Sequence, residues 1–367
     1  MIKPLMIKVS IHSVGLVLGG ACLLSLMAIE AEARRESLTE AQRQALERIQ
    51  LVHVQALVLT DQGEEDATAV RDLVAKKLEE FGYQIVKEPT EPSDAVFRVK
   101  CEQRKTWEGT VSAGGDADLP DSPSRIWKGP ACQLRYLLDG KPMAWAKEVR
   151  TEFEDALKAA NEAGERDPGM FAITRLQERL AKYEFPVFIT TEWGQEARLL
   201  KMLERPDVTS SRKIAIIQAL GDLFAGSAVP YLKPLLKDPD PAVAKAAIIA
   251  LGNIGHRESI AMLVDVLETG TPEMQIEACR GLGKVGGLHG DSTVIPPLIH
   301  AMETGDMKLK TAAVWALGQL PDRRAYEPLL KLQASMGNMR TSDRESPEGK
   351  LFDAVHYTLK QIDGIEH

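Results

Sequence analysis

The sequence predicts an α+β amino-terminal domain followed by an all-α solenoid of stacked helix pairs, in a chain of 367 residues. Two observations support this fold class. A short apolar motif recurs in the carboxy-terminal half at a period that is typical of stacked helical units. Residues 34–190 show no repeat and mix strand-like with helix-like patterns. Hydrophobic residues make up 44% of the chain and charged residues 27%, which suits folded domains and excludes a wholly disordered protein.

The first 33 residues predict a signal for export. Lys3 and Lys8 precede residues 9–29, in which no side chain is charged. Ala31-Glu32-Ala33 then places small residues at positions −3 and −1 of a cleavage site, as in a secretory signal peptide. We therefore expect residues 1–33 to be a signal peptide and the mature protein to be exported to the periplasm or cell envelope.

Two alternatives stay open for this segment. The uncharged stretch is 21 residues long, so it could span a bilayer as an uncleaved anchor. Cys22 could instead carry a lipid, although Gly19-Gly20-Ala21 before it lacks the usual leucine. No other apolar run in the sequence is long enough to cross a membrane, so any membrane contact is expected through an uncleaved amino-terminal segment.

Residues 34–190 predict strand, helix and then several strands, an order typical of a small α+β domain. Asp139-Gly140-Lys141 separates two strand-like runs and predicts a hairpin. Glu64, Glu65 and Asp66 suit the amino-terminal end of a helix, where acidic side chains meet the positive end of its dipole. On pattern alone, the domain loosely resembles small domains of bacterial envelope proteins. The expected strands are 52–59, 84–86, 94–101, 132–138 and 143–150, and the expected helices are 67–81, 152–163 and 171–183.

Two cysteines in this domain could form a disulfide. Cys101 and Cys132 both lie in predicted strands, and an exported protein meets an oxidising environment. A bridge between them would close a loop of about thirty residues and contribute about 3 kcal/mol. Cys279 lies beside small residues of the repeat, where we expect a buried free thiol.

A repeat explains residues 195–334. An Ala-Leu-Gly triplet, with glycine in place of alanine in its third copy, recurs at intervals of 31, 31 and 35 residues. The longer interval reflects four extra residues, assigned to a loop at 286–292. Each unit predicts a helix pair, with the glycines near the end of the first helix, and such pairs must stack to bury their apolar faces. The residues that define the repeat are Ala219, Leu220, Gly221, Leu232, Ala250, Leu251, Gly252, Leu263, Gly281, Leu282, Gly283, Leu298, Ala316, Leu317, Gly318 and Leu329.

Residues 238–270, with their Asp-Pro-Asp-Pro opening and Ala-Leu-Gly-Asn-Ile-Gly core, resemble the short HEAT-like repeat named after phycobilisome lyases. The resemblance covers residues 195–367 and implies a superhelix of about four helix pairs with a leading partial one. Residues 335–349 are expected to be a polar linker and residues 350–367 a capping helix. In that helix Thr358 and Lys360 replace the small residue and the glycine of the pattern, which suits a terminal unit whose outer face meets water.

The candidate motifs for chemistry have simpler structural explanations. Residues 281–286 match the glycine spacing of a dinucleotide-binding loop, but that loop must precede a helix, whereas these glycines end one. HEAT-like deoxyhypusine hydroxylases bind iron through His-Glu pairs, and none of the seven histidines here is followed by glutamate. His256 and His289 could hold a metal only if neighbouring loops converge. We therefore predict no catalytic residue, cofactor or metal ligand, and the net charge of −8 argues against nucleic acid.

These observations favour a non-enzymatic protein-interaction or scaffolding protein of the bacterial cell envelope. The solenoid would bind an unidentified protein partner, since such repeats present extended binding surfaces. The alternative that the resemblance implies is an enzyme related to bilin lyases or to HEAT-repeat hydroxylases. A third possibility is that the α+β domain is the functional unit and the solenoid its tether.

Overall fold

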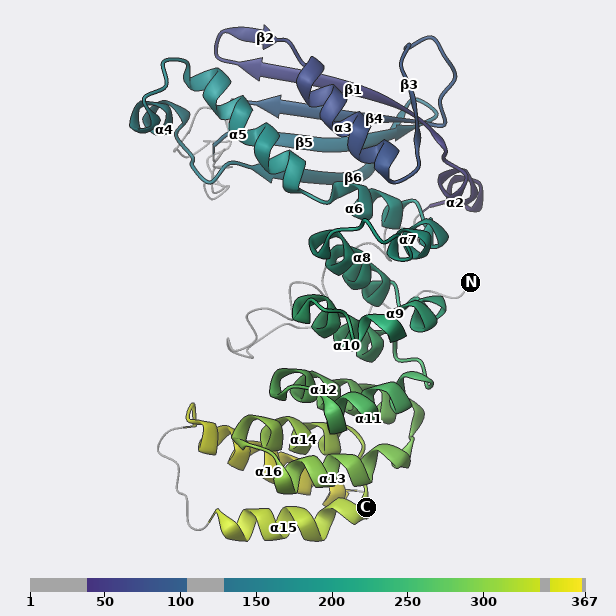
Figure 1. Ribbon diagram of the computed structural model, residues 1–367, viewed down its shortest axis with the longest axis vertical. Helices are drawn as coiled ribbons and strands as arrows, with labels where there is room; N and C mark the ends of the chain where they lie inside the picture. The colour runs from purple at the N-terminus through teal and green to yellow at the C-terminus, as the bar shows by residue number, and fades with distance from the viewer. Residues whose placement is uncertain (1–37, 104–128, 337–343, 365–367) are drawn as a thin grey trace, which may run out of the picture.

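The computed structural model describes residues 38–103, 129–336 and 344–364. A mixed β-sheet with helices on one face lies at one end, and a stack of helices leads away from it (Figure 1). The predicted signal peptide, residues 1–33, lies outside the described residues. Within the described ranges, no helix is both long and apolar enough to cross a membrane.

The sheet of the amino-terminal domain has the strand order β2-β1-β4-β5-β6, and β3 also pairs with β1. Strand β1 is parallel to β3 and β4, whereas the other pairs are antiparallel. Helices α3 (Thr68–Glu80) and α5 (Pro168–Lys182) cover one face (Figure 1), so alternate side chains of the strands form a core between sheet and helices. The strands are β1 (Leu51–Thr60), β2 (Gly63–Glu65), β3 (Gln84–Val86), β4 (Ala95–Glu102), β5 (Ala131–Leu138) and β6 (Lys141–Arg150).

Two turns in this domain decide the fate of two predictions: the hairpin at residues 139–141 is confirmed, and the helix start at residues 64–65 is wrong. Asp139 and Gly140 have φ angles of 51° and 73°, so they form the tight turn that an Asp-Gly pair favours between antiparallel strands. Glu64 and Glu65 were expected at a helix start, but they lie in β2, because the chain reverses at residues 61–62 and pairs Glu64 with Leu59.

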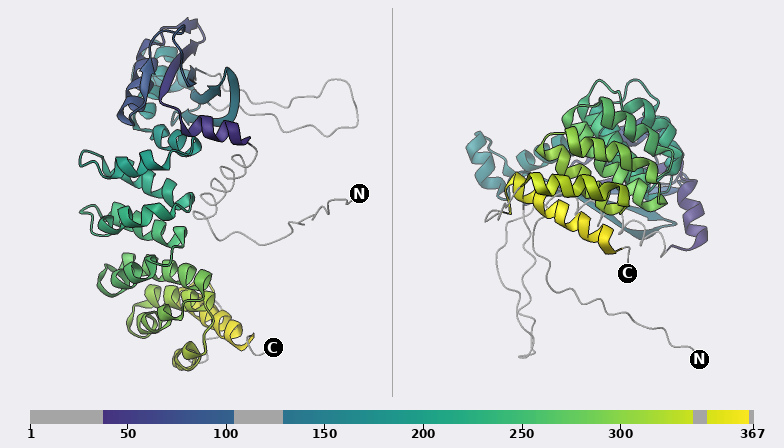
Figure 2. Two further views of the ribbon diagram at one scale, coloured as in Figure 1. Left: turned by 90° about the vertical axis from the view of Figure 1, so that its right-hand side faces the viewer. Right: turned by 90° about the horizontal axis from the view of Figure 1, so that it is seen from below.

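The carboxy-terminal half is a helical solenoid, as predicted. The helix pairs follow one another along the long axis of the molecule (Figure 2). In each pair the first helix packs against the first helices of the neighbouring pairs, and α16 packs against α14 at the end of the stack. The four pairs are α8 (Ser210–Asp222) with α9 (Val229–Leu235), α10 (Pro241–Ile254) with α11 (Ser259–Thr269), α12 (Pro272–His289) with α13 (Ile295–Thr304), and α14 (Met307–Gln319) with α15 (Tyr326–Ser335), followed by α16 (Pro347–Asp363).

The repeat glycines lie near the carboxy-terminal ends of the first helices, as predicted, but they are not the capping residues. Helix α10 continues past Gly252 and ends at Gly255, which has a φ of 70° and caps the helix. A Cβ atom on Gly252 would lie 2.8 Å from the Cα atom of Gly281 in α12, and one on Gly283 would lie equally close to that of Ala316 in α14. This position of the repeat is glycine because the backbones of neighbouring first helices touch there.

The four extra residues of the third unit extend a helix instead of forming the expected loop at 286–292. Helix α12 has 18 residues and α10 has 14, and four residues are about one helical turn. The cap therefore moves to Gly290, which has a φ of 58°. The added turn carries Leu288, whose side chain is 70% exposed.

The two domains share a buried interface. Helices α6 (Phe185–Glu192) and α7 (Glu196–Leu203) form a short leading pair beneath the sheet (Figure 1). The ring of Trp193, which follows α6, contacts those of Tyr83 and Tyr136 at centroid distances of 5.1 and 5.7 Å. Gln195 donates hydrogen bonds to backbone carbonyls of Leu46 and Ile49 near α2 (Glu40–Glu47). The predicted boundary at residue 190 therefore cuts α6, whose second part belongs to this interface.

Candidate functional site

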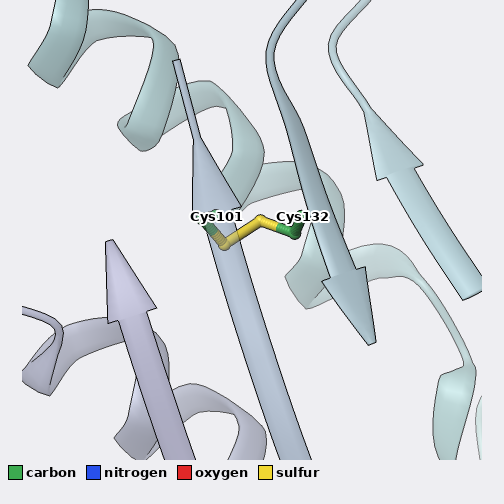
Figure 3. Close-up of a disulfide and its surroundings, with 2 residues drawn as sticks. All are labelled: Cys101 and Cys132. Carbon is green, nitrogen blue, oxygen red and sulfur yellow. A yellow bond between two sulfur atoms is a disulfide. The ribbon is translucent and has the colours of Figure 1, made fainter. Parts of the chain in front are cut away.

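The predicted disulfide residues are paired in the structure. Cys101 of β4 and Cys132 of β5 are direct partners in the sheet register, with their Cα atoms 3.9 Å apart and a bond between their sulfurs (Figure 3). Both are fully buried, so the bridge crosslinks the core. Cys279 is a free, buried thiol in α12, and its burial raises its pKa to about 12.

The residues considered for cofactor or metal binding have structural contacts instead. Residues 281–286 lie within α12, away from any helix start. His289 forms a hydrogen bond of 2.7 Å with the backbone carbonyl of Gly255, and Asp291 accepts one of 2.9 Å from Arg257. These contacts join the second and third units. Among the described residues, no three His, Cys, Asp or Glu side chains are grouped closely enough to hold a metal ion.

The most distinctive surface feature of the solenoid is a groove of about 820 Å³ along the carboxy-terminal ends of its first helices. It crosses α8, α10, α12 and α14 and ends at α16, so each unit contributes to it. The repeat glycines lie in its floor, buried against the neighbouring first helices. We call it the first-helix groove; the side chains that line it are those of Asp222, Phe224, Asn253, Lys284, Leu288, Gln319 and Tyr357.

One polar side chain per unit lines this groove. Asp222, Asn253, Lys284 and Gln319 each follow the repeat glycine of their unit by one residue. Lys284 Nζ donates a hydrogen bond of 2.8 Å to Asn253 Oδ1. Burial raises the pKa of Asp222 to about 6, and this side chain is half-buried, whereas the Lys284 side chain is exposed. Neither forms an ion pair with another described residue, so Asp222 is partly desolvated without a counter-ion.

Large apolar side chains flank the polar row. Phe224 is 58% exposed and Leu288 is 70% exposed. At the α16 end, the ring of Tyr357 lies 5.1 Å from that of Trp315. Exposed apolar groups beside a row of polar side chains are typical of recognition surfaces.

Phe224 also has an unusual backbone. Its φ of 51° is in the left-handed region, which costs a residue with a bulky side chain about 1–2 kcal/mol. The equivalent residue of the next unit is Gly255, which has a φ of 70° and is the residue type that such a helix cap favours. Phe224 thus combines a strained backbone with an exposed aromatic side chain, and strain of this kind gathers at functional sites.

Sequence reasoning missed this groove. The repeat is identified by the residues that its units share, whereas the groove depends on the positions at which the units differ. Aligning the units would have shown Phe224 opposite Gly255 and three kinds of polar side chain in one column. That contrast is the signal that identifies the site.

The family model for HEAT repeats matches residues 196–274 and 266–336. The solenoid of this protein is built of HEAT repeats. No curated protein matches the chain. The crystal structure of an engineered protein is 20% identical, covers 49% of this chain and 84% of its own, and superposes with a TM-score of 0.36. A designed armadillo repeat protein is 17% identical over 48% of this chain and 86% of its own, with a TM-score of 0.34.

The HEAT repeats carry a second groove on their other side, between α11 and α13. It has a volume of about 760 Å³ and is lined mainly by aliphatic and proline residues, among them Val264, Pro296 and Pro297. Glu268 is its one acidic residue, and no Lys or Arg lines it. This groove spans two units, whereas the first-helix groove spans the whole stack and carries both charges. The first-helix groove is therefore the stronger candidate for selective recognition.

Proposed function

We propose that the protein is an exported, non-enzymatic interaction scaffold of the bacterial cell envelope, which binds a protein partner through the first-helix groove of its HEAT repeats. The observation that carries the proposal is Phe224, an exposed aromatic residue on a strained backbone at a position that glycine fits better. Nothing in the fold of α8 explains a phenylalanine there, whereas an aromatic anchor in a binding surface does.

Export rests on the sequence of residues 1–33 and agrees with the buried disulfide between Cys101 and Cys132, because such bonds persist in oxidising compartments. The assignment to the phycobilisome-lyase type of HEAT repeat is part of the same proposal and rests on residues 238–270. In this setting the α+β domain acts as a rigid cap on the solenoid, since the two share a buried interface through Trp193.

Photocrosslinking in cells tests the binding surface. A photoreactive amino acid at Gln319 lies in the groove, and one at Lys331 is an exposed control on the second-helix side. The proposal predicts a discrete crosslinked protein from position 319 that is absent from position 331. Equal crosslinking at both positions, or none at Gln319, would refute it.

Export has its own test. The mature protein recovered from the periplasmic or envelope fraction is expected to begin at Arg34, as amino-terminal sequencing will show. Recovery of the protein from the cytosol with Met1 in place would contradict export and leave the crosslinking result to stand by itself.

A further inference from the structure

Two charges of opposite sign face the first-helix groove without a counter-ion among the described residues. Asp222 lies at the α8 end, and Lys284 lies in α12, two units further along. Asp222 is half-buried, which disfavours its charged form, whereas the Lys284 side chain is exposed at the groove. A ligand that brings a cation to Asp222 and an anion to Lys284 would therefore gain two ion pairs, one of them with a carboxylate that is already partly desolvated.

We propose that the groove binds an extended peptide segment of the partner, which places a basic side chain at Asp222 and an acidic side chain three to four residues away at Lys284. The inference rests on the proposed function, because it names the chemistry of the partner segment in the same groove. It commits to charge order and spacing, which a general apolar contact would not require.

The spacing follows from the repeat. Asp222 and Asn253 occupy equivalent positions in adjacent units, whose packed helices lie about 8–10 Å from one another. Lys284 belongs to the next unit, but its Nζ lies 2.8 Å from Asn253 Oδ1. The two charges are then about 8–13 Å apart, a distance that an extended chain with a rise of about 3.3 Å per residue covers in three to four residues.

The floor of the groove favours an extended chain over a helix. An extended peptide has free backbone N–H and C=O groups that need partners, and a row of polar side chains, one per unit, can supply them. Asn253 lies beside Lys284, whose hydrogen bond its carbonyl accepts, and its amide group can donate to a peptide carbonyl. A helical ligand would need an apolar floor for its apolar face, whereas glycine backbone and polar side chains form this floor.

The apolar residues at the flanks fit the same ligand. Phe224 lies beside Asp222 in sequence, and Leu288 is one helical turn beyond Lys284. A peptide that meets both charges passes close to both apolar side chains, so apolar residues next to its charged ones would be buried there. Phe224 then anchors one end of the segment and Leu288 the other.

A peptide array tests the inference directly. The probes are synthetic peptides with one Arg and one Asp in an Ala, Leu and Ser background, in both orders and at every separation from one to nine residues. The full mature chain is expected to bind best at separations of three or four, in one order. Asp222→Asn and Lys284→Gln should each weaken binding of the best peptide tenfold or more, whereas Asp265→Asn and Lys233→Gln, exposed on second helices, should change it less than twofold.

Charge reversal gives the sharpest outcome. The Asp222→Lys, Lys284→Asp double variant is expected to prefer the opposite order at the same separation, and its thermal unfolding shows that it is folded. Binding that ignores order or separation, or that survives both single substitutions, would overturn the inference. If Gln319 still crosslinks to a partner in that case, the scaffold function stands without this charge pattern. If Gln319 does not crosslink to a partner, both the charge pattern and the proposed scaffold function are contradicted.

Discussion

Replacing Phe224 tests whether the backbone at this position is strained. Its φ of 51° costs an L-residue with a side chain about 1–2 kcal/mol. Because the side chain is 58% exposed, a little under half of it contributes burial, worth about 1 kcal/mol of the 1.5–3 kcal/mol that full burial provides. Phe224→Ala keeps the strained backbone and loses the burial, so it should lower the free energy of unfolding by about 1 kcal/mol.

At Phe224 the glycine variant should be more stable than the alanine variant, which is the reverse of the order usual within helices. Glycine accepts the left-handed conformation at no steric cost, although it gains about 0.5–1 kcal/mol of conformational entropy in the unfolded chain. Strain relief then offsets the lost burial and the entropy, so Phe224→Gly should lie within about 0.5 kcal/mol of the wild type and be more stable than Phe224→Ala. Urea unfolding of the full mature chain, followed by circular dichroism, measures both differences.

Ile249 provides the matched control. It is a 39% exposed apolar residue in the regular helix α10, where alanine is about 1 kcal/mol more favourable than glycine. The alanine variant at Ile249 should therefore be the more stable of the two, and the reverse should hold at Phe224. If alanine is also the more stable substitution at Phe224, the backbone there is not strained. If Phe224→Gly costs 2 kcal/mol or more, Phe224 serves as core, and the argument for a binding anchor fails.

Three further predictions follow from packing, ionisation and crosslinking. Gly252→Ala should destabilise the solenoid by about 1–3 kcal/mol, because its Cβ would lie 2.8 Å from a backbone atom of Gly281; Gly364→Ala, in open space, is the control in thermal unfolding. Burial raises the pKa of Asp222 from 3.8 to about 6, so the unfolded chain loses this proton first and stability falls as the pH rises from 4 to 6. Asp222→Asn should therefore stabilise the protein by about 1–2 kcal/mol at pH 7, after allowance for solvent screening, and leave it unchanged at pH 4. Serine at both Cys101 and Cys132, which are 31 residues apart, should lower the free energy of unfolding by about 3–4 kcal/mol, and a reductant should then have no further effect in urea unfolding.

Local pattern predicted the elements of this fold well, and contacts between units decided what it could not predict. The Asp139-Gly140 turn and the solenoid follow from short-range sequence chemistry and from the period of the repeat. The role of Gly252 did not, because a glycine near a helix end suggests a cap, and only the packing of α10 on α12 shows a close approach. The groove escaped prediction for the same reason: Asp222 and Lys284 are 62 residues apart in sequence and face one surface only after the units stack.

The two ends of the described stack of helices are closed in different ways. At the carboxy-terminal end, Thr358 occupies the position that a small residue has in the other units, and it donates a hydrogen bond of 3.0 Å to the backbone carbonyl of Val314. Lys360 occupies the position of the repeat glycine and is exposed, so no further first helix could pack there as α12 packs on α10. At the other end, the sheet domain covers α6 and α7 through the buried ring of Trp193. The ends of the described stack are therefore covered by the sheet domain and by α16, and the first-helix groove opens along its side.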